Sequence, residues 1–271
     1  MKIITSADNN EIKEAKKLHD SKNRKQSELF FFEGVHLLEE FLKNGKKPYR
    51  IFITEEAKDL YKSLNNFQSF EDFEEKRIIS QKLYGKITAE NAPQGIFTVA
   101  ETSSINVIKT EPSEILKRLD GGAVVLESMR DPGNVGTVIR TAVSLGVKVI
   151  FTEDCADLFN PKVIRASMGA LFADEIFVVP SASALAEYAV KEGFDVYGAI
   201  LDEKAKQLGS FEFGKKSLFI IGNEGAGIKP ETISLCNKYA YIPMTGKTES
   251  LNAAIAASLI MWEISKNHGG K

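Results

Sequence analysis

The sequence predicts an α/β protein with two domains: a C-terminal doubly wound domain with a parallel sheet, preceded by a smaller α/β domain. Three observations support this fold class. After residue 120, short apolar strands alternate with helical patterns at the spacing of βαβ units. Residues 1–101 show the helix and strand patterns of a small mixed α/β unit. Between them, residues 102–119 form a polar connection typical of a domain boundary, with a short helix expected after Pro112.

The N-terminal domain is expected to be a compact α/β sandwich. Its clearest signal is an aromatic strand that ends at Phe30, Phe31 and Phe32 and leads through Glu33-Gly34 into an amphipathic helix. In chain order, the predicted elements are a helix over 10–20, a basic turn, the aromatic strand, the helix through Leu37, Leu38 and Phe41, and strands over 49–53, 77–80 and 95–100.

The C-terminal domain begins with an apolar strand, a DPGN turn, a helix and a second apolar strand within roughly thirty residues. This order predicts a parallel sheet covered by helices. The predicted strands cover 123–126, 148–152, 176–179, 194–201 and 218–221, and the predicted helices cover 135–145, 161–170 and 182–191.

The last elements are a short strand over 241–244, a polar turn with Gly246, and a helix that resumes at Ser250. The helix is apolar nearly all the way round, which predicts that it packs on several sides inside the domain. Its first turn is polar, and a helix start with free N–H groups is suited to hold a ligand. Alternatively, Ser250 is only the N-cap of a core helix.

The composition bounds the function only loosely. The formal net charge of −2 does not indicate nucleic-acid binding, although a net value hides local patches. The two cysteines and three histidines are scattered, so we expect neither a disulfide framework nor a metal site. The N-terminus has no signal-peptide pattern and the longest apolar run, 253–262, is too short for a bilayer, which predicts a cytoplasmic protein without a membrane partner.

A basic patch lies near the N-terminus. Between residues 11 and 25, six lysines and arginines outnumber three acidic residues, and such a patch is able to contact phosphates. The alternative is a charged helix face that meets only solvent.

Three loops rich in Gly and polar residues follow strands of the C-terminal domain: 127–136, 222–227 and 245–252. In a doubly wound sheet, ligands bind beyond the carboxyl ends of the strands. None of the loops has the dinucleotide or P-loop fingerprint, which disfavours an unrelated nucleotide-dependent enzyme. A pocket walled by backbone groups near glycines suits a small polar ligand with a flat ring.

The residues in these loops resemble the three motifs of the SpoU (TrmH) family of RNA ribose methyltransferases, within the SPOUT superfamily. The motifs are Asn134-x-Gly136-x-x-x-Arg140-Thr141, Gly222-Asn223-Glu224-Gly225, and Ile242-Pro243-Met244 followed by Glu249-Ser250-Leu251-Asn252. The resemblance extends to Asn160-Pro161-Lys162, to residues 165–170 and to Phe32-Glu33-Gly34, and so covers nearly the whole chain. Ala253 and Ala254 stand where relatives often carry Val and Ser.

The resemblance implies a methyltransferase domain over 120–271 with a trefoil knot, S-adenosyl-L-methionine as cofactor, and a homodimer whose site is completed across the interface. It implies that residues 1–101 form an RNA-binding domain similar to a ribosomal protein, joined by the linker 102–119. The implied cofactor-binding residues are Gly222, Ile242, Leu251, Leu201, Met244 and Gly246. The implied catalytic residues around the ribose are Arg140, Asn134, Glu224, Ser250 and Asn252.

Arg140 is expected to stabilise developing charge on the ribose 2′-oxygen rather than act as a base, because a guanidinium is effectively never deprotonated. Asn134 and Glu224 would orient it and the ribose; alternatively, they are a capping residue and a turn carboxylate. The residues expected to contact RNA are Lys22, Arg24 and Lys25, in a loop, together with Lys162 and Arg165.

The implied substrate is RNA, with 23S ribosomal RNA favoured by the two-domain layout. Two alternatives remain: a transfer-RNA 2′-O-methyltransferase, and a non-catalytic RNA-binding protein on the same fold.

Overall fold

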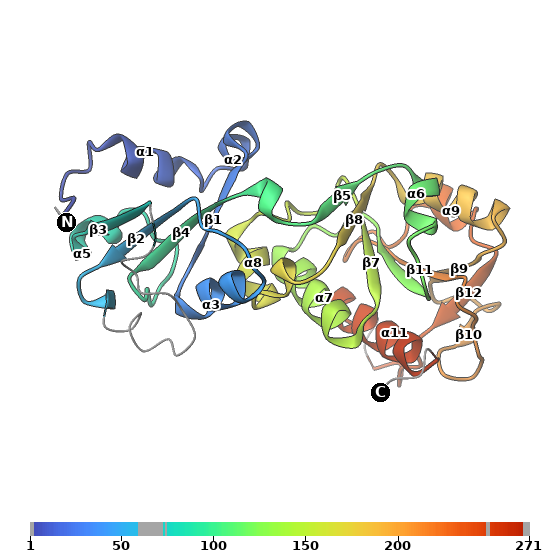
Figure 1. Cartoon of the computed structure of the whole chain (residues 1–271). Helices are drawn as coiled ribbons and strands as arrows, with labels where there is room; N and C mark the ends of the chain where they lie inside the picture. The colour runs from blue at the N-terminus through green and yellow to red at the C-terminus, as the bar shows by residue number, and fades with distance from the viewer. Residues whose placement is uncertain (1–2, 59–72, 74, 248–249, 268–271) are drawn as a thin grey trace. The chain divides into compact units, whose positions relative to one another are not determined.

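The computed structural model describes residues 3–58, 73, 75–247 and 250–267 (Figure 1). Contacts divide the chain into two compact units, each described by itself below. Unit 1 contains residues 1–105 and 157–173, and unit 2 contains residues 106–156 and 174–271. The segment 157–173 therefore packs with the N-terminal part of the chain. The functional boundaries expected at residues 101 and 120 stay a prediction.

Unit 1 has a four-stranded mixed sheet in the order β1-β4-β2-β3, in which β2 and β3 are parallel and the other pairs are antiparallel. The predicted small α/β unit is thus confirmed as a mixed-sheet domain. Its elements are α1 (Asn10–Lys17), α2 (Ser21–Ser27), β1 (Leu29–Glu33), α3 (Val35–Lys43), β2 (Arg50–Thr54), β3 (Lys76–Ile79), α5 (Gln81–Tyr84), β4 (Ile96–Glu101), η2 (Thr102–Ser104), α8 (Pro161–Ser167) and η3 (Ala170–Phe172).

Alternation along β1 sends its aromatic side chains to both faces of this sheet. Phe31 stacks on Phe97 at 4.6 Å between ring centroids, on the face covered by α1. Phe32 packs on Phe41 of α3 and on Phe172 of η3, on the opposite face. Figure 1 shows α1 and α3 on opposite sides of the sheet.

The predicted basic turn after the first helix is wrong, because residues 21–27 form α2. The first helix ends at Lys17, and the Asp20 carboxylate caps α2 by accepting the backbone N–H groups of Lys22 and Asn23. The high content of Lys, Asn and Gln in α2 hides it from a search for apolar periodicity.

Unit 2 has an eight-stranded sheet in the order β10-β12-β9-β11-β6-β7-β8-β5, in which every neighbouring pair is parallel. The predicted parallel-sheet domain is confirmed. Its strands are β5 (Val107–Lys109), β6 (Ala123–Leu126), β7 (Lys148–Thr152), β8 (Ile176–Val179), β9 (Asp195–Ala199), β10 (Lys206–Gln207), β11 (Ser217–Ile221) and β12 (Lys238–Tyr241). Its helices are α6 (Pro112–Leu116), α7 (Pro132–Leu145), α9 (Ala182–Lys191), α10 (Pro230–Ile233) and α11 (Ala253–Asn267).

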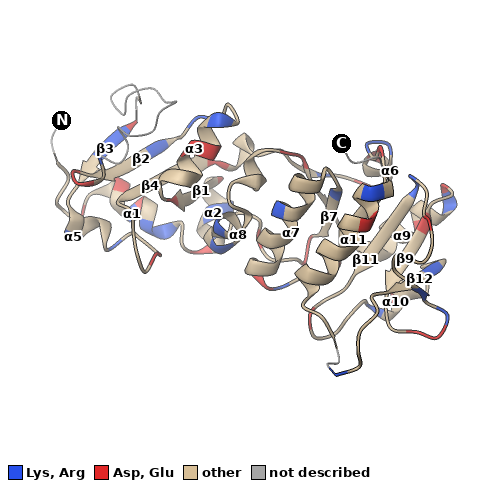
Figure 2. Ribbon diagram, turned by 90° about the horizontal axis from the view of Figure 1, so that it is seen from below, with Lys and Arg blue, Asp and Glu red and all other residues tan. Residues whose placement is uncertain are grey.

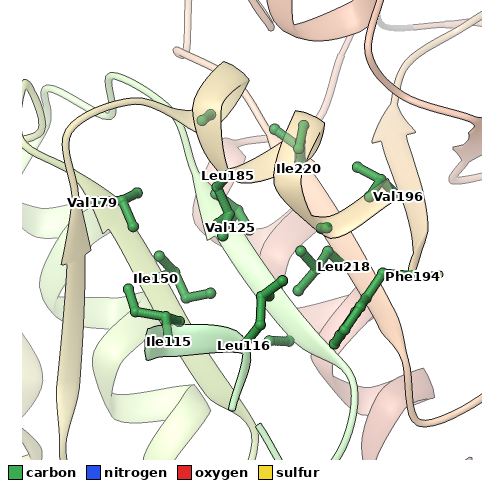
Figure 3. Close-up of a cluster of buried hydrophobic side chains, with 14 of the residues drawn as sticks. Ile115, Leu116, Val125, Ile150, Val179, Leu185, Phe194, Val196, Leu218 and Ile220 are labelled. Atoms are coloured by element: carbon green, nitrogen blue, oxygen red, sulfur yellow. The ribbon is translucent and has the colours of Figure 1, made fainter. Parts of the chain in front are cut away.

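Helices cover both faces of this sheet. On one face, α6, α9 and α10 enclose a core that includes Val125, Ile150, Leu185 and Leu218 (Figure 3). On the other face, α7 and α11 pack against each other and against the sheet. The strands β6, β8 and β11 are buried along their whole length, and β7 is buried except at Lys148, as expected for parallel strands covered on both sides.

Several predicted boundaries shift. The strand predicted over 241–244 overlaps β12 only at Tyr241, and Pro243 in the predicted range has no N–H to donate. The helix predicted over 161–170 ends at Ser167 as α8, and the strand predicted over 194–201 is the shorter β9. The helix α7 begins at Pro132 rather than 135, because Asp131 caps it and proline suits the first helical position. The helix α11 begins at Ala253 rather than 250. The connection predicted over residues 102–119 contains the strand β5 and, after residue 111, the helix α6.

The expectation that α11 is buried on all sides is only partly met. Ala257, Ile260 and Met261 are buried, whereas Ile255, Leu259 and Trp262 are 50%, 39% and 53% exposed. These three residues recur at helical spacing and form one exposed apolar face. Within the described residues, none of the helices has the length and apolar character needed to cross a membrane.

Candidate functional site

A pocket of about 430 Å³ lies at the carboxyl ends of three neighbouring strands of unit 2. Its walls come from residues 199–201 at the end of β9, 221–225 and 227–228 at the end of β11, and 240–242 and 244 at the end of β12, closed by the start of α11. This is where a parallel sheet is expected to bind ligands. Two of the three predicted loops thus line the pocket, and the third, 127–136, reaches it through hydrogen bonds to Glu224.

Five of the six residues expected to bind the cofactor line this pocket: Leu201, Gly222, Ile242, Met244 and Leu251. Gly246 is not among the lining residues. Of the expected catalytic residues, Glu224 and Ser250 line the pocket. Glu249 of the third motif lies outside the described residues.

Gly222 has no room for a side chain. A Cβ atom at this position would lie 2.0 Å from the carbonyl carbon of Gly227 and 2.1 Å from the backbone nitrogen of Ile228. The loop closes because the backbone N–H groups of Asn223 and Gly227 each donate to the other's carbonyl oxygen, at 2.9 Å. Glycine at this position is therefore required for the loop to close on itself, and the closed loop forms this wall of the pocket.

A chain of side-chain hydrogen bonds connects the three motifs. The Asn252 amide nitrogen donates to the Asn134 amide oxygen at 3.0 Å, and the Asn134 amide nitrogen donates to a Glu224 carboxylate oxygen at 3.0 Å. The Asn252 oxygen accepts the backbone N–H groups of Ala254 and Ile255, which makes Asn252 the N-cap of α11. Asn252, rather than Ser250, is thus the N-cap. The two bonds that its side-chain oxygen accepts fix the orientation of the Asn252 amide.

Glu224 is held ionised by its neighbours. Partial burial raises the pKa of its carboxyl, but hydrogen bonds from Asn134 and from the backbone N–H groups of Glu224, Arg130 and Asp131 outweigh that effect, and the pKa lies below its usual value. Hydrogen bonds that a carboxylate accepts stabilise its ionised form. At neutral pH Glu224 is therefore an acceptor that orients donors, rather than a proton donor.

Arg140 is exposed on α7, six residues after Asn134, and is not among the residues that line the pocket. Its side chain forms no hydrogen bond or ion pair with any other residue in the described part of the chain. Its five donors are thus available to a ligand.

A polar cluster at the carboxyl ends of β6 and β7 has no counterpart in the sequence prediction. The Asp154 carboxylate, just after β7, accepts hydrogen bonds from the side chains of Ser128 at 2.5 Å, Thr152 at 2.5 Å and Lys229 at 3.0 Å. Burial raises the pKa of Asp154, but these three hydrogen bonds together lower it well below its usual range. The only sequence signal is a polar run directly after each of two strands, at 127–128 and 152–155.

Ser128 links this cluster to the pocket. Its backbone is in the left-handed region, with φ of 56°, which is unfavourable for a residue with a Cβ. Its carbonyl oxygen accepts a hydrogen bond from the Asn223 amide nitrogen at 2.9 Å. Asp154 therefore acts through Ser128 to position the Gly222 loop.

Two substitutions at Ser128 separate backbone strain from the lost hydroxyl. We expect Ser128→Ala to lower the free energy of unfolding by about 1–3 kcal/mol, because it keeps the strained φ and loses the bond to Asp154. Ser128→Gly removes the same hydroxyl but tolerates positive φ, and we expect a smaller loss. Urea unfolding monitored by circular dichroism measures both. If the two variants are equally stable, the strain argument is wrong.

The residues expected to contact RNA lie in unit 1. Lys22 and Lys25 are exposed on α2 (Lys and Arg are blue in Figure 2), and Lys162 and Arg165 are exposed on α8. The predicted loop is thus a helix. Arg165 pairs with Glu90.

Arg24 is buried, at 3% exposure, in contrast to the expected surface position. Its guanidinium donates to the Asp157 carboxylate at 2.5 Å and to the carbonyl oxygens of Leu18 and His19. Its donors are therefore used to hold α2 in place, and solvent-facing charge on this helix comes from its lysines.

Neither cysteine forms a disulfide. Among the residues that the structure describes, no group of three or more His, Cys, Asp or Glu side chains is arranged to hold a metal ion.

Comparison with known proteins gives consistent matches along the chain. The profile of the SpoU rRNA Methylase family matches residues 122–262, and the profile of an MRM3-like substrate binding domain matches residues 9–98. The 23S rRNA (guanosine(2553)-2'-O)-methyltransferase RlmP of Bacillus subtilis is 30% identical over 97% of this chain and 99% of its own. The 23S rRNA (guanosine-2'-O-)-methyltransferase RlmB of Acinetobacter baylyi is 27% identical over 89% and 98%.

Solved structures show the same fold. The AdoMet-bound rRNA methyltransferase from Sinorhizobium meliloti superposes with a TM-score of 0.79 and 25% identity, covering 98% of each chain. The SpoU methyltransferase AviRb from Streptomyces viridochromogenes, in complex with AdoMet, has a TM-score of 0.75 and 25% identity, covering 96% of this chain and 99% of its own.

Proposed function

The chain belongs to the SpoU rRNA methylase family, and we propose on this basis that it transfers the methyl group of S-adenosylmethionine to a ribose 2′-hydroxyl of 23S ribosomal RNA. The observation that carries the proposal is the hydrogen-bond chain from Asn252 through Asn134 to Glu224 beside the pocket, which unites all three family motifs. The two named relatives above, aligned over most of their length, are 23S rRNA 2'-O-methyltransferases.

The pocket fits S-adenosylmethionine. Its volume of about 430 Å³ is within the usual range for small-molecule sites. Leu201, Ile242 and Leu251 offer apolar surface to a purine ring, and the backbone around Gly222 offers polar groups without a side chain in the way. When bound, the cofactor supplies an electrophilic methyl group on a sulfonium. Gly246, outside the lining, would act only by allowing the chain to turn, since its φ is 76°.

Residues of the protein, rather than the cofactor, would hold the ribose and stabilise charge. We assign to Arg140 the stabilisation of developing negative charge on the 2′-oxygen, because its donors have no partner in the described residues. The hydrogen bond between Asn134 and Glu224 holds the first turn of α7, the helix that carries Arg140 further along. Asn252 orients Asn134, and Ser250 offers a hydroxyl at the pocket wall.

The exposure of Arg140 away from the pocket lining favours a homodimer in which a second copy brings its Arg140 to this pocket. We also propose that the segment from β12 to α11 threads through a trefoil knot, as in family members. The apolar face of α11, formed by Ile255, Leu259 and Trp262, provides a surface for the second copy.

A double substitution on this face tests the dimer. We expect Leu259→Lys with Trp262→Lys to convert a dimer into a monomer, because two charges would be buried without partners. Sedimentation equilibrium measures the mass, and Met168→Lys, at another exposed apolar residue, is the control. A wild-type monomer at micromolar concentration would rule the dimer out.

The function itself is tested on RNA from cells. Nucleoside analysis of ribosomal RNA from wild-type and deletion strains should show one 2′-O-methylated nucleotide that disappears and returns with the wild-type gene. If ribosomal RNA is unchanged and transfer RNA loses a methyl group, the substrate is transfer RNA. If neither changes, the chain is a non-catalytic RNA-binding protein.

A further inference from the structure

A second pocket of about 430 Å³ lies in unit 1, where α1 and α2 meet β2 and β4. None of the residues expected to contact RNA lines it. Its walls carry side chains of several chemical kinds: the amides of Asn23 and Gln26, the ring of Tyr49, the guanidinium of Arg50 and the carboxylate of Glu14. Both helices are labelled in Figure 1.

Several polar groups of this pocket have free hydrogen-bonding capacity. The side chains of Asn23 and Gln26, one turn apart on α2, form no hydrogen bond with other residues that the structure describes. The Nε atom of Arg50 is buried and likewise has no partner in the described part of the chain. The Arg50 Nε atom is inaccessible from the empty pocket, so the groups available to a ligand are the amides of Asn23 and Gln26.

The pocket also offers an aromatic surface. Tyr49 is 41% exposed, and the Arg50 guanidinium lies 5.3 Å from the centroid of its ring. Aromatic rings and guanidinium planes are the surfaces on which proteins stack unpaired RNA bases. A flat ring is thus favoured over an aliphatic ligand.

The charges of this pocket are balanced and do not single out a phosphate, because Glu11 and Glu14 line it together with Lys17 and Arg50. The Arg50 guanidinium nitrogens lie 3.6 Å from Glu11, 3.9 Å from Glu14 and 3.5 Å from Glu75, so three carboxylates surround this cation. Glu11 is already paired with Arg77 at 2.7 Å, whereas the Glu14 side chain is 69% exposed and makes only the long contact. Glu14 is therefore free to accept a hydrogen bond from an amino group of a neutral ligand.

We propose that this pocket binds an unpaired nucleobase with an exocyclic amino group, from a single-stranded part of the substrate RNA. The base stacks on Tyr49, its amino group donates to Glu14, and its ring nitrogens and carbonyl pair with Asn23 and Gln26. Lys22 and Lys25, which adjoin those two residues in α2, contact the neighbouring phosphates. The assignment rests on the proposed action on RNA, and it adds a base-reading site to unit 1, separate from the pocket of unit 2.

The test compares fluorescein-labelled twelve-residue oligocytidine and oligouridine RNA by fluorescence anisotropy with the full chain. Cytosine has an amino group at the position where uracil has a carbonyl oxygen, so the pair differs in the group that Glu14 reads. We expect oligocytidine to bind about fivefold more tightly. Glu14→Gln should remove this preference, because an amide also donates.

Tyr49→Ala should weaken oligocytidine binding about tenfold, and Tyr49→Phe should restore it by returning the ring. Asn23→Ala with Gln26→Ala should weaken binding to a similar extent. The matched control is Gln81→Ala, an exposed glutamine of the same unit outside the pocket. Equal affinity of wild type for the two oligonucleotides, or Tyr49→Ala binding within twofold of Gln81→Ala, overturns the proposal.

A separate assay of methyl transfer to ribosomal RNA by the wild-type protein distinguishes failure of the base pocket from failure of the proposed function. If wild type methylates ribosomal RNA while Tyr49→Ala binds oligocytidine as the control does, the base pocket is wrong and the function stands. If Tyr49→Ala weakens oligocytidine binding and wild type methylates no RNA, the base pocket stands and the function is wrong.

Discussion

Arg140→Ala should lower methyl transfer to ribosomal RNA by about 10²–10³-fold, the effect of removing one preorganised donor that faces developing charge. Arg140 is exposed and has no partner within the described residues, so its removal should leave the fold and the cofactor pocket intact. The measurement is single-turnover transfer of a tritiated methyl group, combined with the affinity for S-adenosylhomocysteine by calorimetry.

Arg140→Lys tests the geometry. It keeps the positive charge but loses the planar fork of donors, and we expect most of the activity to be lost. Arg118→Ala, at a half-exposed arginine paired with Glu175, is the control for a general effect of charge. Near-full turnover by Arg140→Lys would show that charge alone is sufficient, and full turnover by Arg140→Ala would remove Arg140 from the mechanism.

Gly222→Ala should abolish binding of S-adenosylhomocysteine and lower the melting temperature. The new methyl group would meet the backbone of Gly227 and Ile228 at 2.0–2.1 Å. Backbone atoms, unlike a side chain, cannot avoid this clash by changing rotamer. Overpacking usually costs about 1–3 kcal/mol. Here the loop has to open, because the paired hydrogen bonds between Asn223 and Gly227 cannot survive the shift.

The control for Gly222→Ala lies three residues further along the same loop. A Cβ at Gly225 would meet only the Asn223 side-chain oxygen, at 3.7 Å, which is an ordinary contact. Gly225→Ala should therefore keep the melting temperature of the free protein, and it controls for packing within the loop, since Gly225 also lines the pocket. If the two variants behave alike, the close approach at Gly222 does not shape the site.

Local patterns predicted the elements whose signals are contained in a few neighbouring residues. The helix over 182–191 was predicted with the bounds of α9, because its Ser181 cap and its apolar spacing are both local. The buried strands of unit 2 were found for the same reason. The motifs of three loops located the pocket, since parallel strands bring their carboxyl ends together.

Features that depend on distant partners were not predicted. Ser128 and Asp154 are ordinary polar residues in sequence, and their importance arises only when β6 and β7 pair side by side. Arg24 was placed on the surface because nothing nearby in sequence shows that Asp157, 133 residues later, would bury it. Tertiary contacts of this kind decide whether a charged residue faces solvent.

The inclusion of residues 157–173 in unit 1 affects folding during synthesis. Domains generally fold as units as the ribosome produces them, at about 5–20 residues per second. Unit 1 cannot complete its aromatic core until Phe172 has left the ribosome, by which time β6 and β7 of unit 2 have been made without their outer neighbours β11 and β8. Their neighbour β11 comes later still, so this chain exposes apolar strand edges in its nascent state and is expected to need chaperone protection there.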